Sequence, residues 1–335
     1  MKRTLWLSLF VISLVFCVTS MSAEASEWKD KGEAEGKLVW YCTMGTADAK
    51  KIIDRFKELY PKIDSQFYRT GDAQLMERIL AEARGGKFLW DAVTTTGYYT
   101  YFLKKRSMIT VYDSPERKYF PAGHKDPQGT WSSIYTNYAV LGYNSRAVRK
   151  ENVPKSHRDL LKPLWKGQIG MVSTAYEWFA VVLQGMGKEK GVALMRELAK
   201  QQPQLRTNRT LLSQLVAAGE VTSALTAYSQ NFENLKRDGA PVDWVALDPV
   251  YGNLNPMGLS AKAPHPSAGR LFVDFLLSKE GQEVIRSERR VPDRVDVLPD
   301  PPKLAQGFVP VFTADEIYEN FDSYVTLFRD IFGKN

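Results

Sequence analysis

Residues 65–82, SQFYRTGDAQLMERILAE, contain a short extended segment that ends in Arg-Thr-Gly and changes at once into a helical pattern. The apolar residues at positions 75, 76, 79 and 80 have the spacing of one helix face, and Asp72 or Thr70 is expected to cap this helix. Such a junction leaves backbone N–H groups and the positive end of a helix dipole, about half a charge, facing solvent. With Arg69 beside them, the junction is a candidate anion site, although an ordinary turn with a solvated arginine also fits.

The same succession of strand, small polar loop and helix recurs along the chain. In the first half, strand-like runs at residues 36–42, 63–68 and 90–93 each precede such a loop. In the second half, the runs at 168–172 and 222–226 repeat the pattern. Strands that alternate with helices predict an α/β fold with mostly parallel sheets, whose ligands bind beyond the carboxyl ends of the strands.

The length of the chain and two connecting segments predict two domains. A chain of 335 residues exceeds what one hydrophobic core usually holds. Residues 131–144 form an extended segment long enough to leave one domain and enter the other, and residues 248–255 form a predicted loop, rich in Gly and Asn, that crosses back. The expected lobe 1 is residues 26–135 plus 252–300, and the expected lobe 2 is residues 136–251 plus 301–335.

The N-terminus has the layout of a secretory signal peptide at residues 1–25. Lys2 and Arg3 precede an apolar run, and small residues follow it up to Ala25, the expected cleavage site. A single membrane anchor is the alternative, but the run is short for a bilayer span and no basic stop signal follows it directly. The sequence therefore predicts an exported, periplasmic protein.

Cysteine content and charge exclude several classes of site. Without the leader, Cys42 is the only cysteine, which excludes an internal disulfide, a cysteine-rich zinc site and an iron–sulfur cluster. Its place at the end of an apolar strand predicts a buried thiol. The formal charge of +7 favours anionic partners only weakly. Because no run of Lys and Arg interleaved with aromatic residues occurs, nucleic acid is not an expected partner.

The sequence shows no catalytic signature. His124, His157 and His265 are widely spaced, and each is expected to be exposed at a loop or helix start. Neither a Gly-x-Ser-x-Gly elbow nor a phosphate loop ending in Gly-Lys-Ser is present. An enzyme is therefore the weaker class, and no cofactor is expected.

Binding has more support, because small polar residues follow strands at several places. In a two-domain α/β protein these loops converge on one cleft, with hydroxyls, backbone N–H groups and one arginine for a bidentate contact to a carboxylate or phosphate. Each loop alone also suits an ordinary helix cap, whereas the set favours a cleft. The predicted binding residues are Thr43, Gly45, Arg69, Thr70, Gly71, Thr95, Thr96, Ser173, Thr174, Ala175, Tyr228, Asn231 and Asn255.

Several segments resemble one family. They are YCTMGTADAKKIIDRF at 41–56, YRTGDAQLMERI at 68–79, GYNSRAV at 142–148 and PHPSAGRLFVDFLLSKEGQEVI at 264–285, within which DFLLSKEGQ is the most specific piece. In these segments the chain is similar to the periplasmic solute-binding proteins of ABC importers, and most similar to the ferric-ion-binding branch of the type II class. The resemblance implies a monomer of two α/β lobes, which closes on its solute and delivers it to a permease in the inner membrane.

The resemblance leaves the cargo open between a small anion and Fe(III). The ferric branch typically holds iron with two adjacent tyrosines, often helped by a His or Tyr in the first loop. The matching positions here carry Tyr228-Ser229 and residues 43–46, TMGT, so the second tyrosine and the histidine are absent. Tyr98 and Tyr99 are adjacent but are expected to pack on a helix. A small organic or phosphorylated anion is therefore the favoured cargo, with Fe(III) bound through Tyr228 as the alternative.

Overall fold

The computed structural model describes residues 20–333, with side chains from Trp28 onward. Residues 1–19 of the predicted leader lie outside the described part, and residues 20–25 begin helix α1 (Ser20–Glu35). No helix between residues 20 and 333 is long and apolar enough to cross a membrane.

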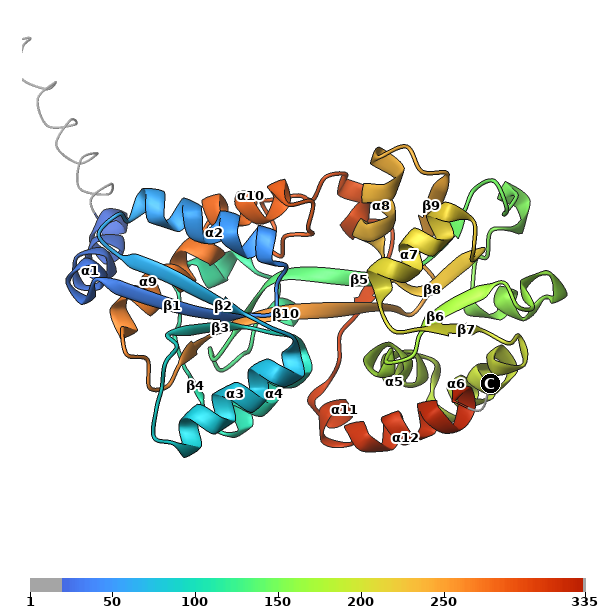
Figure 1. The fold of residues 1–335 in the computed structure, drawn as a ribbon, viewed down its shortest axis with the longest axis horizontal. Helices are drawn as coiled ribbons and strands as arrows, with labels where there is room; N and C mark the ends of the chain where they lie inside the picture. The colour runs from blue at the N-terminus through green and yellow to red at the C-terminus, as the bar shows by residue number, and fades with distance from the viewer. Residues whose placement is uncertain (1–19, 334–335) are drawn as a thin grey trace, which may run out of the picture.

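Lobe 1, on the left of Figure 1, is built on three parallel strands. Strand β1 (Lys37–Cys42) lies between β2 (Asp64–Arg69) and β3 (Ala92–Thr94) and pairs in parallel with both. The helices of this lobe are α1, α2 (Thr46–Leu59), α3 (Asp72–Arg84), α4 (Gly97–Lys105), α9 (Pro266–Leu277) and α10 (Lys279–Ser287). The apolar stripes of α2 and α9 meet over the sheet, where the Phe272 ring lies 5.0 Å from that of Phe56 and 5.2 Å from that of Trp40.

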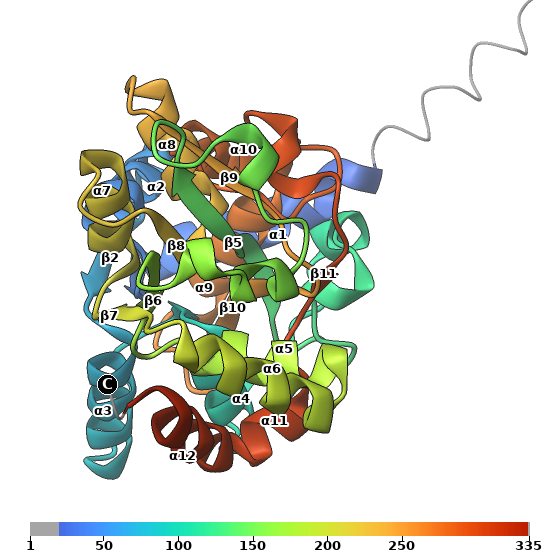
Figure 2. The ribbon, with the colours of Figure 1, turned by 90° about the vertical axis from the view of Figure 1, so that its right-hand side faces the viewer.

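Lobe 2 repeats the arrangement. Strand β6 (Ile169–Val172) pairs in parallel with β7 (Gln204–Arg206) and with β8 (Ser223–Tyr228). Its helices are α5 (Tyr176–Met186), α6 (Lys188–Lys200), α7 (Arg209–Ala218), α8 (Ser229–Arg237), α11 (Asp315–Glu319) and α12 (Phe321–Phe332). Figure 2 shows α7 and α8 on one side of these strands and α5, α6 and α12 on the other. The lobe is therefore a sheet with helices on both faces.

Two long strands join the lobes. Strands β5 (Ser132–Asn144) and β10 (Val250–Ser260) pair antiparallel, with Gly252 opposite Tyr138. Strand β5 continues beside β8 and β9 (Val242–Val245), while β10 also pairs with β3, β4 (Ile109–Thr110) and β11 (Pro310–Val311). One 11-stranded sheet therefore runs through both lobes. Short 3-10 helices occur at Pro115–Tyr119, Ala122–His124, Lys150–Asn152, His157–Leu161, Pro163–Trp165 and Pro302–Ala305.

The prediction of a loop at residues 248–255 is wrong, because most of this segment belongs to β10. Glycine and asparagine are poor strand formers, but here β5 pairs with residues 252–254 and β11 pairs with Val250 and Tyr251, which supplies the backbone with partners. The Asn255 side chain donates to the carbonyls of Asn253 and Tyr135, and the register shifts between Leu254 and Pro256. Tertiary pairing therefore overrides local propensity in this crossing.

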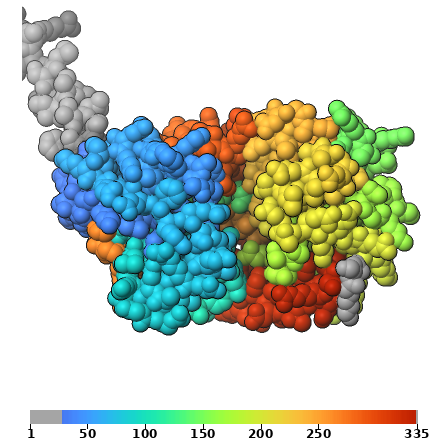
Figure 3. Space-filling model, in the orientation of Figure 1, coloured from blue at the N-terminus to red at the C-terminus, as the bar shows by residue number. Residues whose placement is uncertain are grey.

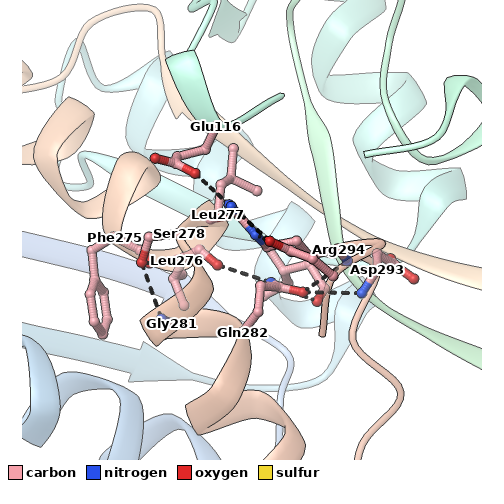
Figure 4. Close-up of polar contacts among 11 residues, drawn as sticks. Glu116, Phe275, Leu276, Leu277, Ser278, Gly281, Gln282, Asp293 and Arg294 are labelled. Carbon is pink, nitrogen blue, oxygen red and sulfur yellow. Dashed lines mark hydrogen bonds and ion pairs between the residues drawn. The ribbon is translucent and has the colours of Figure 1, made fainter. Parts of the chain in front are cut away.

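The most specific segment of the resemblance, DFLLSKEGQ, has a structural role in lobe 1 (Figure 4). The buried Gln282 side chain donates to the carbonyls of Ile134 and Leu276 and accepts from the N–H groups of Asp293 and Arg294. A Cβ at Gly281 would lie 2.8 Å from Cα of Leu276, which requires glycine. The segment thus fastens α10 to strand β5 and to the loop that follows α10.

The structure corrects two smaller predictions. Gly71 is the N-cap of α3 and makes no side-chain capping bond, so neither Asp72 nor Thr70 caps this helix. His124 and His157 are buried, not exposed: Nδ1 of His157 lies 3.0 Å from the carbonyl oxygen of Asp248, and the His124 ring packs on Phe312. Cys42 is fully buried, as predicted, and burial raises the pKa of its thiol to about 12.

Candidate ligand-binding cleft

The surface between the two lobes is hollowed into a groove, visible at the centre of Figure 3. The loops that follow β1, β2 and β3 approach it from lobe 1, and the loops that follow β6 and β8 approach it from lobe 2 (Figure 1). Carboxyl ends of parallel strands are the usual location of ligand sites in α/β proteins. The geometry of the two walls therefore decides what the groove can bind.

On the lobe 1 wall, Asp72 is held by the loop after β3. Oδ1 of Asp72 accepts from the Thr95 hydroxyl at 2.6 Å and from the Thr96 N–H at 3.2 Å. Asp72 is the first residue of α3, where the helix dipole stabilises a negative charge. Thr95 itself is buried. The wall thus presents a carboxylate in a fixed orientation.

The arginines of lobe 1 have partners of their own. Arg69 is exposed, and its Nε donates to the carbonyl of Met44 at 3.1 Å. Arg290 donates to Oδ2 of Asp48 from Nε at 2.7 Å, and its guanidinium lies 4.6 Å from the centre of the Tyr135 ring. The charge of Arg69 therefore lies at the surface, and the charge of Arg290 is neutralised by its ion pair with Asp48.

On the lobe 2 wall, Tyr228 is the last residue of β8 and connects the lobe to the crossing strand. Its hydroxyl accepts from Nδ2 of Asn253 on β10 at 2.6 Å. The guanidinium of Arg209, at the start of α7, lies 4.7 Å from the centre of the Tyr228 ring. Nε of Arg209 donates to the carbonyl of Thr226 at 3.1 Å. Its two terminal amino groups have no hydrogen-bond partner among the residues that the structure describes.

Glu177, in the first turn of α5, is the carboxylate of the lobe 2 wall. Its Oε2 accepts from the hydroxyl of Tyr251 on β10 at 2.6 Å. Its Oε1 is buried and has no partner within the described chain. Burial raises the pKa of Glu177, while hydrogen bonds from Tyr251 and Tyr318 and the charge of Arg209 lower it and the charge of Asp72 raises it. The charge of Asp72, on the lobe 1 wall, therefore disfavours the ionised form of Glu177.

Tyrosines surround these charges. Burial, then the charges of Asp72, Tyr98 and Glu177, raise the pKa of Tyr99, whose ring packs on that of Tyr98. Burial also raises the pKa of Tyr228, and raises the pKa values of Tyr251 and Tyr318 far above the usual range. All these phenols are therefore neutral at physiological pH in the unliganded protein.

The other predicted site residues contribute mostly backbone. The N–H groups of Thr43, Thr70, Ser173 and Ala175 already donate to backbone carbonyls. Gly45, Gly71 and Ala175 are helix N-caps, Thr174 is exposed and Asn231 is half-buried in α8. Asn255 is buried within β10. The structure thus brings Thr95, Thr96 and Tyr228 into hydrogen-bonded contact with the walls of the groove and leaves Arg69 at the surface.

The sequence reasoning missed the charged groups that the groove brings together, Glu177 and Arg209, and the role of Asp72. Each lies within the first turn of a helix that follows a predicted strand or loop. Because Asp72 was interpreted as a cap, its side chain was not assigned to the site. A search of the first helical turn, as well as the loop before it, finds all three.

Comparison with known proteins agrees with this architecture. The model of a family of bacterial extracellular solute-binding proteins matches residues 93–320, more than half of the chain. An uncharacterized protein of Haemophilus influenzae is 26% identical over 289 residues, which are 79% of this chain and 80% of that protein.

Two further relatives are named for their ligands. The Fe(3+)-binding periplasmic protein of Serratia marcescens is 24% identical over 174 residues, 49% of this chain and 51% of that protein. A Salmonella typhimurium periplasmic protein named for binding 2-aminoethylphosphonate is 28% identical over 186 residues, 52% of this chain and 55% of that protein. The match therefore spans about half the length of these two relatives.

Solved structures share the fold over almost their whole length. Iron-bound HitA from Pseudomonas aeruginosa has a TM-score of 0.75 at 23% identity, covering 88% of this chain and 99% of that chain. AfuA from Actinobacillus pleuropneumoniae, with fructose-6-phosphate bound, has a TM-score of 0.75 at 21% identity, covering 90% and 99%. The fold is thus the two-lobed type II fold of periplasmic binding proteins. From the family match and this architecture, we conclude that the chain belongs to the family of bacterial extracellular solute-binding proteins.

Proposed function

We propose that this protein is the periplasmic receptor of an ABC importer and that its solute carries an anionic group bound by Arg209. The observation that supports the proposal is the position of Arg209 at the groove, with its terminal amino groups free within the described residues and its guanidinium over Tyr228. A guanidinium can hold a carboxylate or phosphate with two parallel hydrogen bonds.

The loop amides support the same choice. Most of the predicted N–H donors already bind backbone carbonyls, so they cannot also bind a ligand. Among relatives, one is named for binding a phosphonate and one similar structure contains a sugar phosphate. The family is one of binding proteins that work with membrane permeases, and we propose no enzymatic activity for this chain. A permease of the inner membrane is the proposed partner of the monomer.

Two arginine variants test the proposal. The purified protein is screened by thermal shift against 2-aminoethylphosphonate, fructose 6-phosphate, inorganic phosphate and ferric citrate, and titrated calorimetrically with each ligand that binds. We expect Arg209→Ala to weaken binding by about 2 kcal/mol or more, roughly 30-fold, because it removes one partner of a desolvated charge pair. Arg69→Ala, the matched control, should change affinity less than about threefold because Arg69 is exposed.

The opposite result would restore the prediction made from the sequence. If Arg69→Ala abolishes binding and Arg209→Ala does not, the anionic group lies at the junction of β2 and α3. If both variants bind as the unaltered protein does, neither arginine holds the ligand and the proposal is wrong.

Fe(III) is the second candidate cargo, because Tyr228, Tyr251, Tyr318 and Glu177 bring hard oxygen donors together. Iron would have to deprotonate phenols whose pKa values burial raises. Within the described residues, no three His, Cys, Asp or Glu side chains form a metal-binding group. We therefore expect no phenolate-to-iron charge-transfer band with ferric citrate, and a band that Tyr228→Phe removes would favour iron.

A further inference from the structure

Helices α11 and α12 are part of the core of lobe 2. Ile317 of α11, with Phe328 and Phe332 of α12, is buried among the apolar residues of that core. The Phe328 ring lies 5.4 Å from the ring of Phe179 on α5. Because a close-packed core moves as one body, any rotation of lobe 2 carries α11 and α12 with it.

The same two helices contact lobe 1 through side chains outside the crossing strands. The ring of Tyr98 on α4 lies 4.3 Å from that of Phe321, the first residue of α12, and 5.8 Å from that of Tyr318 on α11. The Tyr101 ring lies 5.4 Å from that of Tyr318, and the Tyr101 hydroxyl donates to Oε1 of Glu319 at 3.0 Å. Figure 3 shows α11 and α12, in red, against lobe 1 below the groove. These five residues form a clasp between the lobes.

The rings supply most of the attraction in the clasp. Gly97 begins α4 beside Tyr318, and a Cβ at this position would overlap the Tyr318 hydroxyl, so the two helices approach closely. Nζ of Lys105 lies 3.0 Å from Oε1 of Glu319, but both side chains are exposed and such an ion pair contributes little. Aromatic pairs at these centre-to-centre distances attract one another beyond the effect of burial alone.

A cavity of about 220 Å³ adjoins the clasp. Tyr101 and Tyr318 of the clasp line it, together with Leu254 and Pro256 of the crossing strand β10. Protein interiors are normally close-packed, so shifting one packed element displaces its neighbours. Because a cavity lies beside the clasp, α11 can shift relative to β10 with less displacement of packed side chains.

We propose that the clasp holds the two lobes at the angle seen in this structure before any solute binds, and that its release lets them rotate apart about β5 and β10. The inference goes beyond the proposed function, because it concerns the unliganded protein and is independent of the identity of the solute. The apparent affinity for a solute that needs this angle scales with the fraction of molecules that already have it. The clasp therefore strengthens the binding of any such solute.

The distance between spin labels on the two lobes tests the proposal without ligand. The labels are attached at Glu77→Cys on α3 and Gln214→Cys on α7, two exposed positions with one on each lobe. In the protein without its predicted leader, Cys42 is the only other cysteine, and it stays unlabelled because it is fully buried. Double electron–electron resonance gives the distance distribution, and circular dichroism with the thermal midpoint establishes that each variant is folded.

Two variants loosen the clasp. Tyr98→Ala removes the ring that contacts both α11 and α12, and it should lower the ratio of the original distance to longer distances about tenfold, because two ring contacts between the lobes are lost. Gly97→Ala displaces Tyr318 and should change the distribution in the same direction. If Tyr98→Ala does not fold, Gly97→Ala alone decides, since alanine is a good helix former at this position.

Two controls leave the clasp residues in place. Phe102→Ala removes a ring of α4 that lies 4.9 Å from the Tyr98 ring and contacts no ring of lobe 2 among the described residues. Asp238→Asn removes an exposed ion pair with Arg289, which joins the lobes at another place with a distance of 3.5 Å. Each control should change the ratio less than about threefold.

Two results would overturn the inference. If the folded clasp variants keep the distance distribution of the unaltered protein, the clasp does not hold the lobes. If Phe102→Ala lengthens the distance as much as Tyr98→Ala does, loosening of α4 alone explains the change and the clasp is not its cause. Neither result bears on Arg209, so the proposed function is tested separately.

Discussion

The two walls of the groove differ in where their polar groups find partners. On lobe 1, Asp72 is bound by Thr95 and Thr96, and Arg69 by Met44, all within the same lobe. On lobe 2, Tyr228 and Glu177 are bound by Asn253 and Tyr251, which belong to the crossing strand β10. The side chains of the lobe 1 wall are thus held within their own lobe, although the Thr95 N–H also donates to the Pro256 carbonyl of β10, whereas the side chains of the lobe 2 wall are held by the connection between lobes.

This difference separates two tasks. A wall fixed within its lobe offers the ligand a preorganised surface at low entropic cost. The side chains of a wall that is hydrogen-bonded to the crossing strand move when that strand bends. Ligand contacts on lobe 2 are therefore linked to the angle between the lobes. Each prediction below changes one wall and uses the other as its reference.

The largest expected effect is the substitution of Gly142, which lies on β5 under lobe 2. A Cβ at this position would overlap ring carbons of the buried Phe232 on α8, so Gly142→Ala should destabilise the protein by about 3 kcal/mol. Gly45→Ala on lobe 1 is the control: its nearest neighbour would be 3.5 Å away and its φ of −55° suits alanine, so it should cost less than about 1 kcal/mol. Urea unfolding measures both, and equal costs would contradict the packing described for α8.

A double-mutant cycle tests the bond between Tyr228 and Asn253. Tyr228→Phe leaves Nδ2 of Asn253 without its acceptor and should cost about 1–2 kcal/mol in unfolding free energy. Combined with Asn253→Ala, it should show a coupling energy of about 1 kcal/mol. Thr95→Val and Asn253→Ala change residues on different walls that do not contact each other, so their effects on the unfolding free energy should be additive. If Thr95 and Asn253 are coupled and Tyr228 and Asn253 are not, the crossing strand holds the lobe 1 wall and not the lobe 2 wall.

A smaller effect is expected from pH, through Glu177. Burial raises its folded-state pKa above the usual 4.5, so the folded protein binds more protons than the unfolded chain above pH 4.5. Stability should therefore fall as pH rises from 4.5 through the folded-state pKa, with Tyr251, Tyr318 and Arg209 opposing the shift and Asp72 adding to it. Glu177→Gln should lose less stability than the unaltered protein over this window, measured without ligand. Parallel pH curves would show that Glu177 is not buried in the groove.

The smallest expected effect concerns Cys42, at the end of β1, whose rate of labelling should not change. Its thiol is buried and has a pKa of about 12, so a thiol reagent at pH 8 should label it only through opening of lobe 1. Because the lobe 1 wall is set within its lobe, loosening lobe 2 by Tyr228→Phe should leave the labelling rate unchanged. Faster labelling in that variant would show that the two walls are not independent.

Local patterns were enough to predict most elements of the fold. The strand-like runs at 36–42 and 63–68 form β1 and β2, and the long extended segment at 131–144 is β5. The sequence failed at 248–255, where pairing with β5 and β11 overrides the preference of Gly and Asn for loops. The buried positions of His124 and His157 depend on contacts with residues far along the chain, which no local pattern encodes.

The candidate site was harder to predict than the fold. Loops after strands pointed to the groove between the lobes, but the direction of a long side chain is decided by tertiary partners. The carbonyl of Met44 holds Arg69 at the surface, and the ring of Tyr228 with the carbonyl of Thr226 holds Arg209 at the groove. The effect of the Asp72 charge on Glu177 is also invisible in sequence, because the two residues are far apart in the chain and lie on different lobes.

The distribution of the two cores along the chain has a consequence for the order of synthesis. The apolar core of lobe 1 needs residues from Leu38 to Ile285, and the core of lobe 2 includes Phe328 and Phe332 near the end of the chain. A ribosome must therefore have added almost the whole polypeptide before either core can close. A shorter nascent chain therefore lacks a complete core in either lobe.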